Sequence, residues 1–303
     1  MSPRVSVLIP SYNHARFLPA ALQSVFDQTY TDYEIVVVDD GSTDGSVELL
    51  RSYGDRIRLF TQQNRGTYPT LNRCIAESRG EYLAILNSDD LWAPTKLEKQ
   101  VAFLDAHPQV GLVHTGGHFI DAEGRILSHN PLGFPWPRTP TGNIIELLVR
   151  YNRIVPSSAV LRRECFERVG GFREDLYGLG DWEMWLRVAL EYDIGYIDEP
   201  LTLYRVHGAN AFLQHHRLLE DEVKVRAETI HACETRFMQR ANDPRAMRLA
   251  LAHSYACLGT DYALLGDRKQ ARRAYIRSLQ LYPLRFKSVL RLMLTFLPVK
   301  PPL

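Results

Sequence analysis

The sequence predicts an α/β protein built on a mostly parallel sheet, followed by an all-helical C-terminal region. Over the first 90 residues, short apolar runs alternate with segments of helical spacing, a rhythm typical of βαβ units. Polar loops follow three of the apolar runs, at the strand ends where such sheets bind ligands. After about residue 211 the pattern is helical only.

Four apolar runs are expected to form strands, at 5–9, 34–38, 57–60 and 82–86. The second run is continuously apolar, as in a central strand that is covered on both faces. Between them, apolar residues at helical spacing predict helices at 17–28, 45–53 and 69–78. Asp44 is expected to cap the second helix, and the third ends near Gly80.

The middle of the chain, about 111–210, is mixed. A helix is expected at 181–192, and short strands are expected to flank Glu199 and Pro200. The prolines predict a loop that can act as a mobile flap; they are Pro131, Pro135, Pro137 and Pro140.

The C-terminal region begins with an expected long charged helix at 215–240. Pro244 follows Asn242 and Asp243, a strong helix start because proline is favoured at the first helical position. Gly266 separates two further helices, and Pro283 ends the second.

Composition excludes several classes of protein. The formal net charge is +1, so no global charge points to a nucleic-acid partner. No apolar run is long enough for a signal peptide or a membrane span, so we expect a cytoplasmic protein. No cysteine pair has the spacing of a zinc or redox motif, and inert thiols are expected; the cysteines are Cys74, Cys165, Cys233 and Cys257.

Asp89 and Asp90 stand together at the end of the fourth apolar run, after Asn87 and Ser88. Adjacent carboxylates repel each other unless a cation or hydrogen-bond donors neutralise them. Carboxylates suit Mg²⁺ or Mn²⁺, which usually also bind substrate phosphates. A solvated turn or a helix cap is the alternative, but the position beside two other polar loops favours the metal.

Two further acids are candidates. The loop with Asp39 and Asp40 can accept hydrogen bonds from a base or from ribose hydroxyls, or it is a simple turn. Asp181 stands at an expected helix start and can act as a general base for a sugar hydroxyl. Trp182 and Trp185 beside it can form an apolar wall, although core packing is commoner for tryptophan at helical spacing.

Five motifs in order resemble the inverting glycosyltransferases of family 2, which have the GT-A fold. They are Val5-Ser-Val-Leu-Ile-Pro-Ser-Tyr-Asn13, Val36-Val-Val-Asp-Asp-Gly-Ser-Thr-Asp44, Tyr82-Leu-Ala-Ile-Leu-Asn-Ser-Asp-Asp90, Arg162-Arg-Glu-Cys-Phe-Glu-Arg-Val-Gly-Gly-Phe172 and Gly180-Asp-Trp-Glu-Met-Trp-Leu-Arg187. Each motif is weak alone, but the ordered set is highly specific and covers about residues 3–210. The resemblance implies a transferase domain at 1–210 and a separate helical region at 211–303.

The resemblance assigns roles residue by residue. Pro10, Tyr12 and Asn13 match the strand-end segment around the donor base, and Asp40 matches the acid that binds the base, with Asp39 beside it. Asp90 matches the metal-binding acid, Asp89 the neighbour that contacts the donor, and Asp181 the catalytic base. Many relatives have aspartate where this chain has Asn87, which puts one donor contact in doubt. His207 matches a late motif and can touch the metal or the diphosphate, or be structural.

The implied reaction is a single displacement. A Mn²⁺ or Mg²⁺ ion neutralises the diphosphate of a nucleotide-sugar, with UDP favoured over dTDP or GDP, and Asp181 takes the proton of an acceptor hydroxyl. The acceptor is expected to be a glycan or a lipid-linked glycan of a surface polysaccharide. Absent glycine-rich motifs disfavour a nucleotidyltransferase or a dehydrogenase, and a catalytically dead scaffold is the remaining alternative.

Residues 252–285 resemble one tetratricopeptide repeat, and a single repeat cannot bury its apolar face alone. It therefore packs on its own enzyme, on a second copy in a homo-oligomer, or on a partner. Nine Lys or Arg residues and no acid follow Asp267. Such a basic amphipathic tail can lie on the inner face of a membrane, or it is a solvated helix face.

Overall fold

The computed structural model describes residues 2–128, 135–208, 210 and 214–297. Within them, one eight-stranded sheet has the order β3-β2-β1-β4-β7-β6-β8-β5. The strands are β1 (Val5–Ser11), β2 (Tyr33–Asp39), β3 (Arg58–Thr61), β4 (Tyr82–Ile85), β5 (Leu91–Trp92), β6 (Val110–Ile120), β7 (Val160–Arg162) and β8 (Asp193–Arg205).

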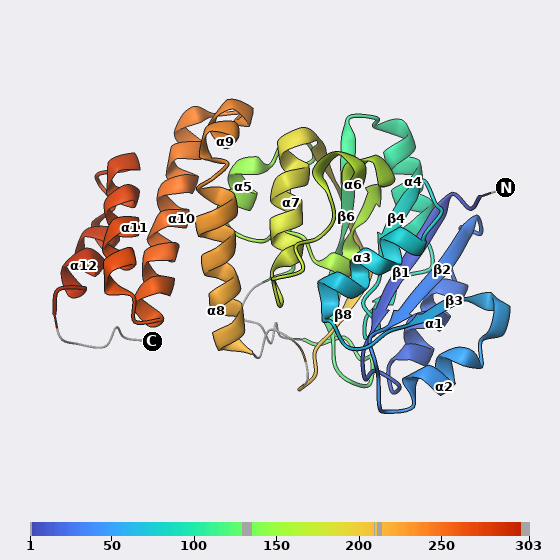
Figure 1. Ribbon diagram of the computed structural model, residues 1–303. Helices are drawn as coiled ribbons and strands as arrows, with labels where there is room; N and C mark the ends of the chain where they lie inside the picture. The colour runs from blue at the N-terminus through green and yellow to red at the C-terminus, as the bar shows by residue number, and fades with distance from the viewer. Residues whose placement is uncertain (1, 129–134, 209, 211–213, 298–303) are drawn as a thin grey trace.

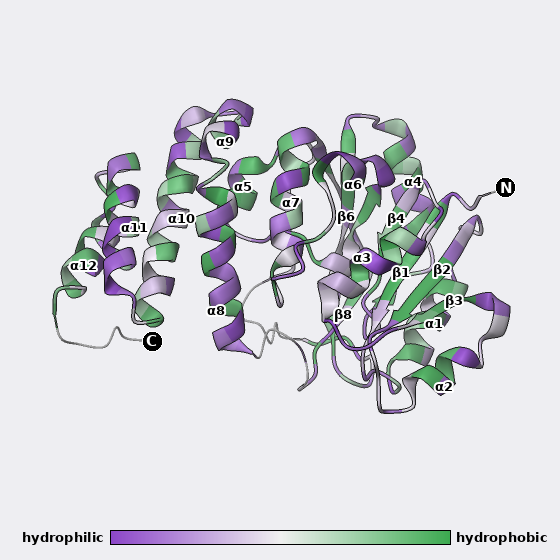
Figure 2. Ribbon diagram, in the orientation of Figure 1, coloured by the Kyte–Doolittle hydropathy of each residue, from purple (hydrophilic) through white to green (hydrophobic). Residues whose placement is uncertain are grey.

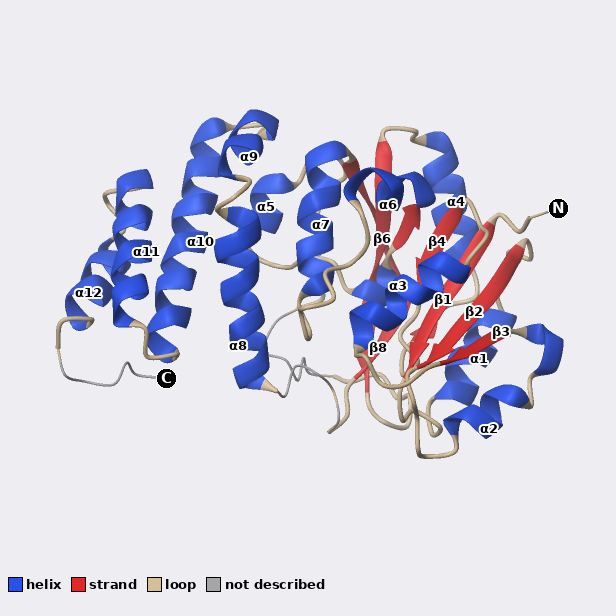
Figure 3. Ribbon diagram, in the orientation of Figure 1, coloured by secondary structure: helices blue, strands red, loops and turns tan. Residues whose placement is uncertain are grey.

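The first four strands run parallel, as the sequence predicts. β7 is antiparallel to β4 and β6, β6 and β8 are parallel, and β5 is antiparallel to β8. The sheet is therefore mixed but mostly parallel, with helices packed around it (Figure 3). Its strands are largely apolar in Figure 2, which fits burial on both faces.

Helices connect the strands and then continue alone. The helices of the sheet domain are α1 (Leu18–Phe26), α2 (Ser46–Arg51), η1 (Gly54–Arg56), α3 (Thr67–Glu77), α4 (Lys96–Ala106), α5 (Ile145–Arg150), η2 (Pro156–Ser158), α6 (Arg163–Val169) and α7 (Gly180–Glu191). Those of the C-terminal region are α8 (His215–Lys224), η4 (Val225–Ile230), α9 (Glu234–Arg240), α10 (Pro244–Leu264), α11 (Arg268–Leu281) and α12 (Phe286–Leu294).

Four expected strands and three expected helices lie within a few residues of their predicted places. Two expectations were wrong. The short strands around Pro200 are one strand, β8, which passes through irregular pairing opposite Gly116 and Gly117. The long helix expected at 215–240 is interrupted by the π-helical turn η4, where the His231 N–H donates to the Arg226 carbonyl five residues earlier. Some polar side chains of this wider turn face the interior of the protein. The distribution of charged residues in the sequence does not reveal that orientation.

The helix start expected at Pro244 is confirmed, and a side chain caps it. At α10, the Asp243 carboxylate accepts the Arg245 N–H at 2.8 Å, and Pro244 occupies the first turn. At α2 the cap residue is Gly45, while Asp44 accepts the Ser46 N–H at 3.0 Å. Pro131 of the expected flap lies outside the described residues.

The C-terminal helices are stacked side by side, away from the sheet (Figure 1). α10 packs on α5 and α8, α11 packs on α10, and α12 packs on α11. The main hydrophobic core joins the sheet and α7 to residues of the C-terminal region, namely Val225, Ile230, Phe237, Met247, Ala250 and Leu251. The helical region thus shares its core with the sheet domain, and the hairpin α10–α11, which the sequence predicts to resemble a tetratricopeptide repeat, is attached through α10.

Candidate active site

The loops after β1 and β2 are joined at the carboxyl edge of the sheet. The Asp40 N–H donates to the Ser11 carbonyl at 2.8 Å, and the Asn13 N–H donates to Ser42 Oγ at 2.8 Å. In return, Asn13 Oδ1 accepts the Thr43 N–H at 2.8 Å. The sequence rule that placed polar loops together at this edge is therefore confirmed for these two loops.

Asp39 and Asp40 are buried, and both are fully hydrogen bonded. Asp39 accepts the Ser42 N–H at 2.8 Å and its hydroxyl at 2.7 Å. Asp40 accepts the N–H groups of Arg65 and Gly66 at 2.9 and 2.8 Å, as well as Gln62 Nε2. Because Gly66 is the N-cap of α3, the Asp40 carboxylate also meets the positive end of that helix. Both acids order the loops around the candidate base site.

The residues expected around the donor base differ in exposure. Pro10 is buried inside β1, whereas Tyr12 is 46% exposed and leaves its ring free to meet a ligand. Asn13 has φ of 53°, which is uncommon for a residue other than glycine. Its side chain holds this backbone in place through the Thr43 bond, and such local strain gathers at functional sites.

The third loop, after β4, brings Asp89 beside two histidines. His207 Nε2 lies 3.0 Å from Asp89 Oδ2. In the described part of the chain, His14, Asp89 and His207 form a group whose ligand atoms all lie within 4.8 Å of one another. One carboxylate and two imidazoles can hold a divalent metal ion.

The surroundings of His14 favour the neutral imidazole, which is the form that binds a metal ion. Burial lowers the pKa of His14 below its ordinary value, against the opposing effect of the Asp89 charge. Its Nδ1 lies 2.8 Å from Ser88 Oγ, which leaves Nε2 for a ligand. The Phe17 ring packs against both His14 and His207, with centroids 5.8 and 4.7 Å apart. The two histidines are thus held by side chains rather than by loop backbone alone.

Asp90 occupies a different place from Asp89. It is fully buried, with Ser157 Oγ donating to Oδ2 at 2.5 Å and the Arg205 N–H donating to Oδ1 at 2.8 Å. Burial, and then the Asp89 charge, raise its pKa well above the ordinary value. Both of its oxygens join structural elements, so the geometry favours Asp89 over Asp90 as a metal ligand. Asn87 is half-buried, and its N–H donates to Ser157 Oγ at 3.0 Å.

Asp181 lies in the first turn of α7, as expected, and is 6% exposed. Asn152 Nδ2 donates to its Oδ2 at 2.9 Å, and the Trp182 N–H donates to Oδ1 at 2.7 Å. Burial raises the pKa of Asp181 to about 6, against these hydrogen bonds. A carboxylate with this pKa is mostly ionised at pH 7 and is well matched to general-base catalysis. Trp182 and Trp185 are core residues.

Tyr204, near the end of β8, interacts electrostatically both with the Asp89–Asp90 pair and with Asp181. Burial raises its pKa strongly, and the charges of Asp90, Asp89 and Asp181 raise it further, in that order. The phenol of Tyr204 therefore interacts electrostatically with the acids of the β4 loop and with the acid of α7. Asn152 binds Asp181 and Ser157, five residues later, binds Asp90, so one short segment joins the two acidic groups.

A family model described as "Glycosyl transferase family 2" matches residues 6–170, more than half of the chain. The chain therefore belongs to glycosyl transferase family 2, and its fold is of the GT-A type. An uncharacterized glycosyltransferase of Nostoc sp. is 33% identical over 220 residues, which cover 68% of this chain and 66% of that protein. The chain spans from 34% to 66% of the length of the first such relatives.

Solved structures share the fold. TarS of S. aureus in complex with UDP-GlcNAc has a TM-score of 0.68 and 19% identity, covering 97% of this chain and 87% of that one. The mannosyltransferase PcManGT from Pyrobaculum calidifontis, in complex with GDP-Man and Mn²⁺, has a TM-score of 0.58 and 23% identity over 98% of this chain and 86% of that one.

Several residues at the site were missed by sequence reasoning. His14 directly follows the Tyr12–Asn13 pair in a loop already assigned to the site, so its position was the available signal. Nothing in the sequence pointed to Ser157 or Asn152, which reach the acids from a loop and a short helix more than 25 residues away.

Proposed function

We propose that this protein is a metal-dependent, inverting glycosyltransferase that moves a sugar from a nucleotide-sugar to an acceptor hydroxyl. One observation carries the proposal. Asp181, a buried carboxylate with a raised pKa, is bound by Asn152, and Ser157, five residues later, binds Asp90, the chain neighbour of Asp89 in the metal-type group. The family motifs lie on these same loops and helix.

The metal group suits Mn²⁺ better than Mg²⁺. Two of its three donors are imidazole nitrogens, and Mg²⁺ prefers oxygen ligands. His14, Asp89 and His207 would hold the cation, and a cation there neutralises the negative charge of a diphosphate leaving group. Asp90 stabilises the site indirectly, because its two hydrogen bonds join β8 to η2.

Asp181 is proposed to take the proton of the acceptor. As the hydroxyl oxygen attacks the anomeric carbon, the bond from that carbon to the diphosphate oxygen breaks, and the hydroxyl proton passes to an Asp181 oxygen. Attack opposite the leaving group inverts the anomeric configuration. Asn152 keeps the carboxylate oriented through its 2.9 Å hydrogen bond.

UDP is the proposed nucleotide, with GDP and dTDP as alternatives. Hydrogen bonds hold the Asp39–Asp40 loop in a fixed conformation beside the proposed base site. The exposed Tyr12 ring offers a surface on which a base can stack. The named ligands of the similar structures, UDP-GlcNAc and GDP-Man, support a nucleotide-sugar but do not separate the two bases.

A glycan or lipid-linked glycan is the proposed acceptor, and α12 supports the lipid-linked form. No helix among the described residues is long and apolar enough to cross a bilayer. α12 nevertheless exposes Phe286 and Met293, at 75% and 62%, and Leu284 just before it is 81% exposed. Lys287 and Arg291 lie on the same helix. Apolar side chains among cations suit an anionic membrane surface.

Vesicle sedimentation tests this surface. Binding to vesicles with anionic lipid, reduced by Met293→Ser and by high salt, supports membrane contact. Retention in solution with every vesicle, together with a concentration-dependent dimer in sedimentation, would assign the surface to a second copy instead.

Nucleotide release tests the proposed reaction. The wild-type protein is incubated with Mn²⁺, a panel of UDP-, GDP- and dTDP-sugars, and glycan acceptors. Release from one nucleotide class is expected, with at least a 100-fold loss in Asp181→Asn and unchanged nucleotide binding. Glu220→Gln is the control, since the Glu220 side chain is 53% exposed and pairs with His216 on the same helix, α8. Binding without turnover on any sugar would favour the catalytically inactive scaffold.

A further inference from the structure

The loop that precedes the candidate base is held by the C-terminal region. Tyr177, Gly178 and Leu179 come directly before Gly180 and Asp181, and Leu179 is the N-cap of α7. The Asp221 carboxylate, on α8, accepts all three of their N–H groups. Its oxygens lie 2.8 and 3.0 Å from the Tyr177 nitrogen, 2.6 Å from that of Gly178 and 3.1 Å from that of Leu179.

This contact is buried and close-packed. Asp221 is 2% exposed. A Cβ added to Gly178 would lie 2.5 Å from Leu218 Cδ2, so the loop backbone approaches α8 as nearly as glycine allows. The Arg217 guanidinium lies 3.7 Å from the centre of the Tyr177 ring. α8 therefore fixes both the backbone and a side chain of the loop.

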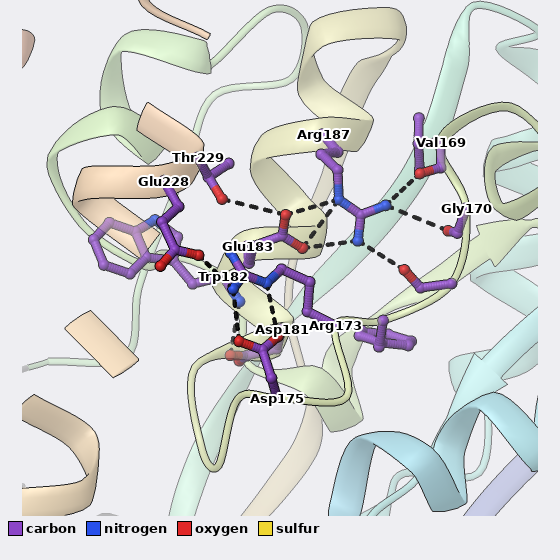
Figure 4. Close-up of polar contacts among 12 residues, drawn as sticks. Val169, Gly170, Arg173, Asp175, Asp181, Trp182, Glu183, Arg187, Glu228 and Thr229 are labelled. Atoms are coloured by element: carbon purple, nitrogen blue, oxygen red, sulfur yellow. Dashed lines mark hydrogen bonds and ion pairs between the residues drawn. The ribbon is translucent and has the colours of Figure 1, made fainter. Parts of the chain in front are cut away.

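Further polar contacts attach the C-terminal region to the first turns of α7 (Figure 4). Thr229 of η4 donates to Glu183 Oε1 at 3.3 Å, and Glu183 pairs with Arg187 at 2.7 Å. Arg173 bridges Asp175 and Glu228 at 2.7 and 2.6 Å. Glu183 lies two residues after Asp181 on α7, and Arg173 lies in the segment that precedes α7, so the C-terminal region contacts the chain on both sides of Asp181.

We propose that Asp221 is a positioning residue for the base Asp181, so that the helical region is part of the catalytic apparatus rather than an appended module. The inference rests on the proposed function. Three N–H groups that converge on one buried carboxylate fix the loop that leads into α7, and α7 carries Asp181. A general base must be held near the acceptor hydroxyl to act, and a displacement of about 1 Å can cost about 100-fold in rate.

The Asp221 charge also reaches the base. It adds to the burial that raises the pKa of Asp181. Among the residues that the structure describes, Tyr68 on α3 and Tyr204 on β8 also interact electrostatically with Asp181. Both phenols have raised pKa values and stay neutral near pH 6, so Asp221 is the charged neighbour whose removal changes the field at the base.

The test is Asp221→Asn, which keeps the shape of the side chain. It replaces one carboxylate oxygen by an NH₂ group, which cannot accept a hydrogen bond from the three N–H donors. We expect kcat to fall at least tenfold, the dissociation constant for the nucleotide to stay within twofold, and the acid limb of the pH–rate profile to move to lower pH. Amide exchange at residues 177–179 should become faster. Glu220→Gln, at the neighbouring position on α8 with a side chain that is 53% exposed, should leave all four unchanged.

Each other outcome is decisive. A folded Asp221→Asn protein with kcat within twofold of wild type and an unmoved acid limb would overturn the inference. If that variant does not fold, Leu218→Ala loosens the same contact without a buried charge, and it should show the same loss of kcat with intact nucleotide binding. If the wild-type protein transfers no sugar at all, the proposed function fails first and the positioning role falls with it.

Discussion

Replacing Asp181 by asparagine should stabilise the protein at neutral pH while it abolishes transfer. Burial raises the pKa of this carboxyl from 3.8 to about 6. The folded state therefore binds more protons than the unfolded state between these values, and stability falls as pH rises through this window. Above pH 6 the ionised group lowers the free energy of unfolding by about 3 kcal/mol.

Asparagine removes this penalty and keeps an oxygen for the Trp182 N–H. It exchanges the second oxygen for an NH₂ group that faces the Asn152 amide, which costs about 1 kcal/mol. That cost is the same at every pH. The difference in unfolding free energy, Asp181→Asn minus wild type, should therefore rise by about 2.4 kcal/mol between pH 4 and pH 7.

Urea denaturation of both proteins at pH 4, 5, 6 and 7 measures this difference. Asp175→Asn serves as the control. Its partner Arg173 lowers the pKa of Asp175 to about 2, so its effect should be flat between pH 5 and 7. A flat difference for Asp181→Asn would refute a raised pKa at this carboxyl and, with it, a base tuned by burial.

Three further predictions follow from other contacts. At pH 4, where the raised pKa keeps Asp90 neutral in the folded state, Asp90→Ala should lower the free energy of unfolding by about 3 kcal/mol, because it leaves the Ser157 hydroxyl and the Arg205 N–H buried without an acceptor, whereas Asp89→Ala should change it by less than about 1 kcal/mol; equal losses in urea denaturation would contradict the roles assigned here. Gly259→Ala should lower stability by about 1–3 kcal/mol, because its Cβ would lie 2.7 Å from the Tyr275 ring where α10 and α11 meet; a raised melting temperature would mean that this contact relaxes freely. For wild-type protein, the acid limb of the pH–rate profile should have an apparent pKa near 6, and a limb near pH 4 would exclude Asp181 in its present surroundings.

The first half of the fold followed from the sequence because its elements are set by local patterns. The runs at 35–38 and 82–86 are apolar throughout, and each became part of a strand in the core of the sheet. Since parallel strands place their carboxyl ends at one edge, the loops with Asn13 and Asp40 were expected to meet there, and they do.

The finer parts of the site depend on contacts that no local pattern encodes. Asp89 and Asp90 look equivalent in sequence, but they lie in a turn beyond β4, and tertiary contacts separate their side chains. Asp89 lies with the histidines and Asp90 lies against Ser157. Asp221 was missed because it lies 40 residues after Asp181, in a segment expected to be a separate region.

Calorimetric titration with UDP, GDP and dTDP, each with and without Mn²⁺, tests most directly whether these loops form a metal-dependent donor site. We predict that one nucleotide binds only with Mn²⁺, that Asp89→Ala abolishes this binding, and that Asp181→Asn preserves it. Binding of no nucleotide, or metal-dependent binding that survives Asp89→Ala, would contradict the site described here.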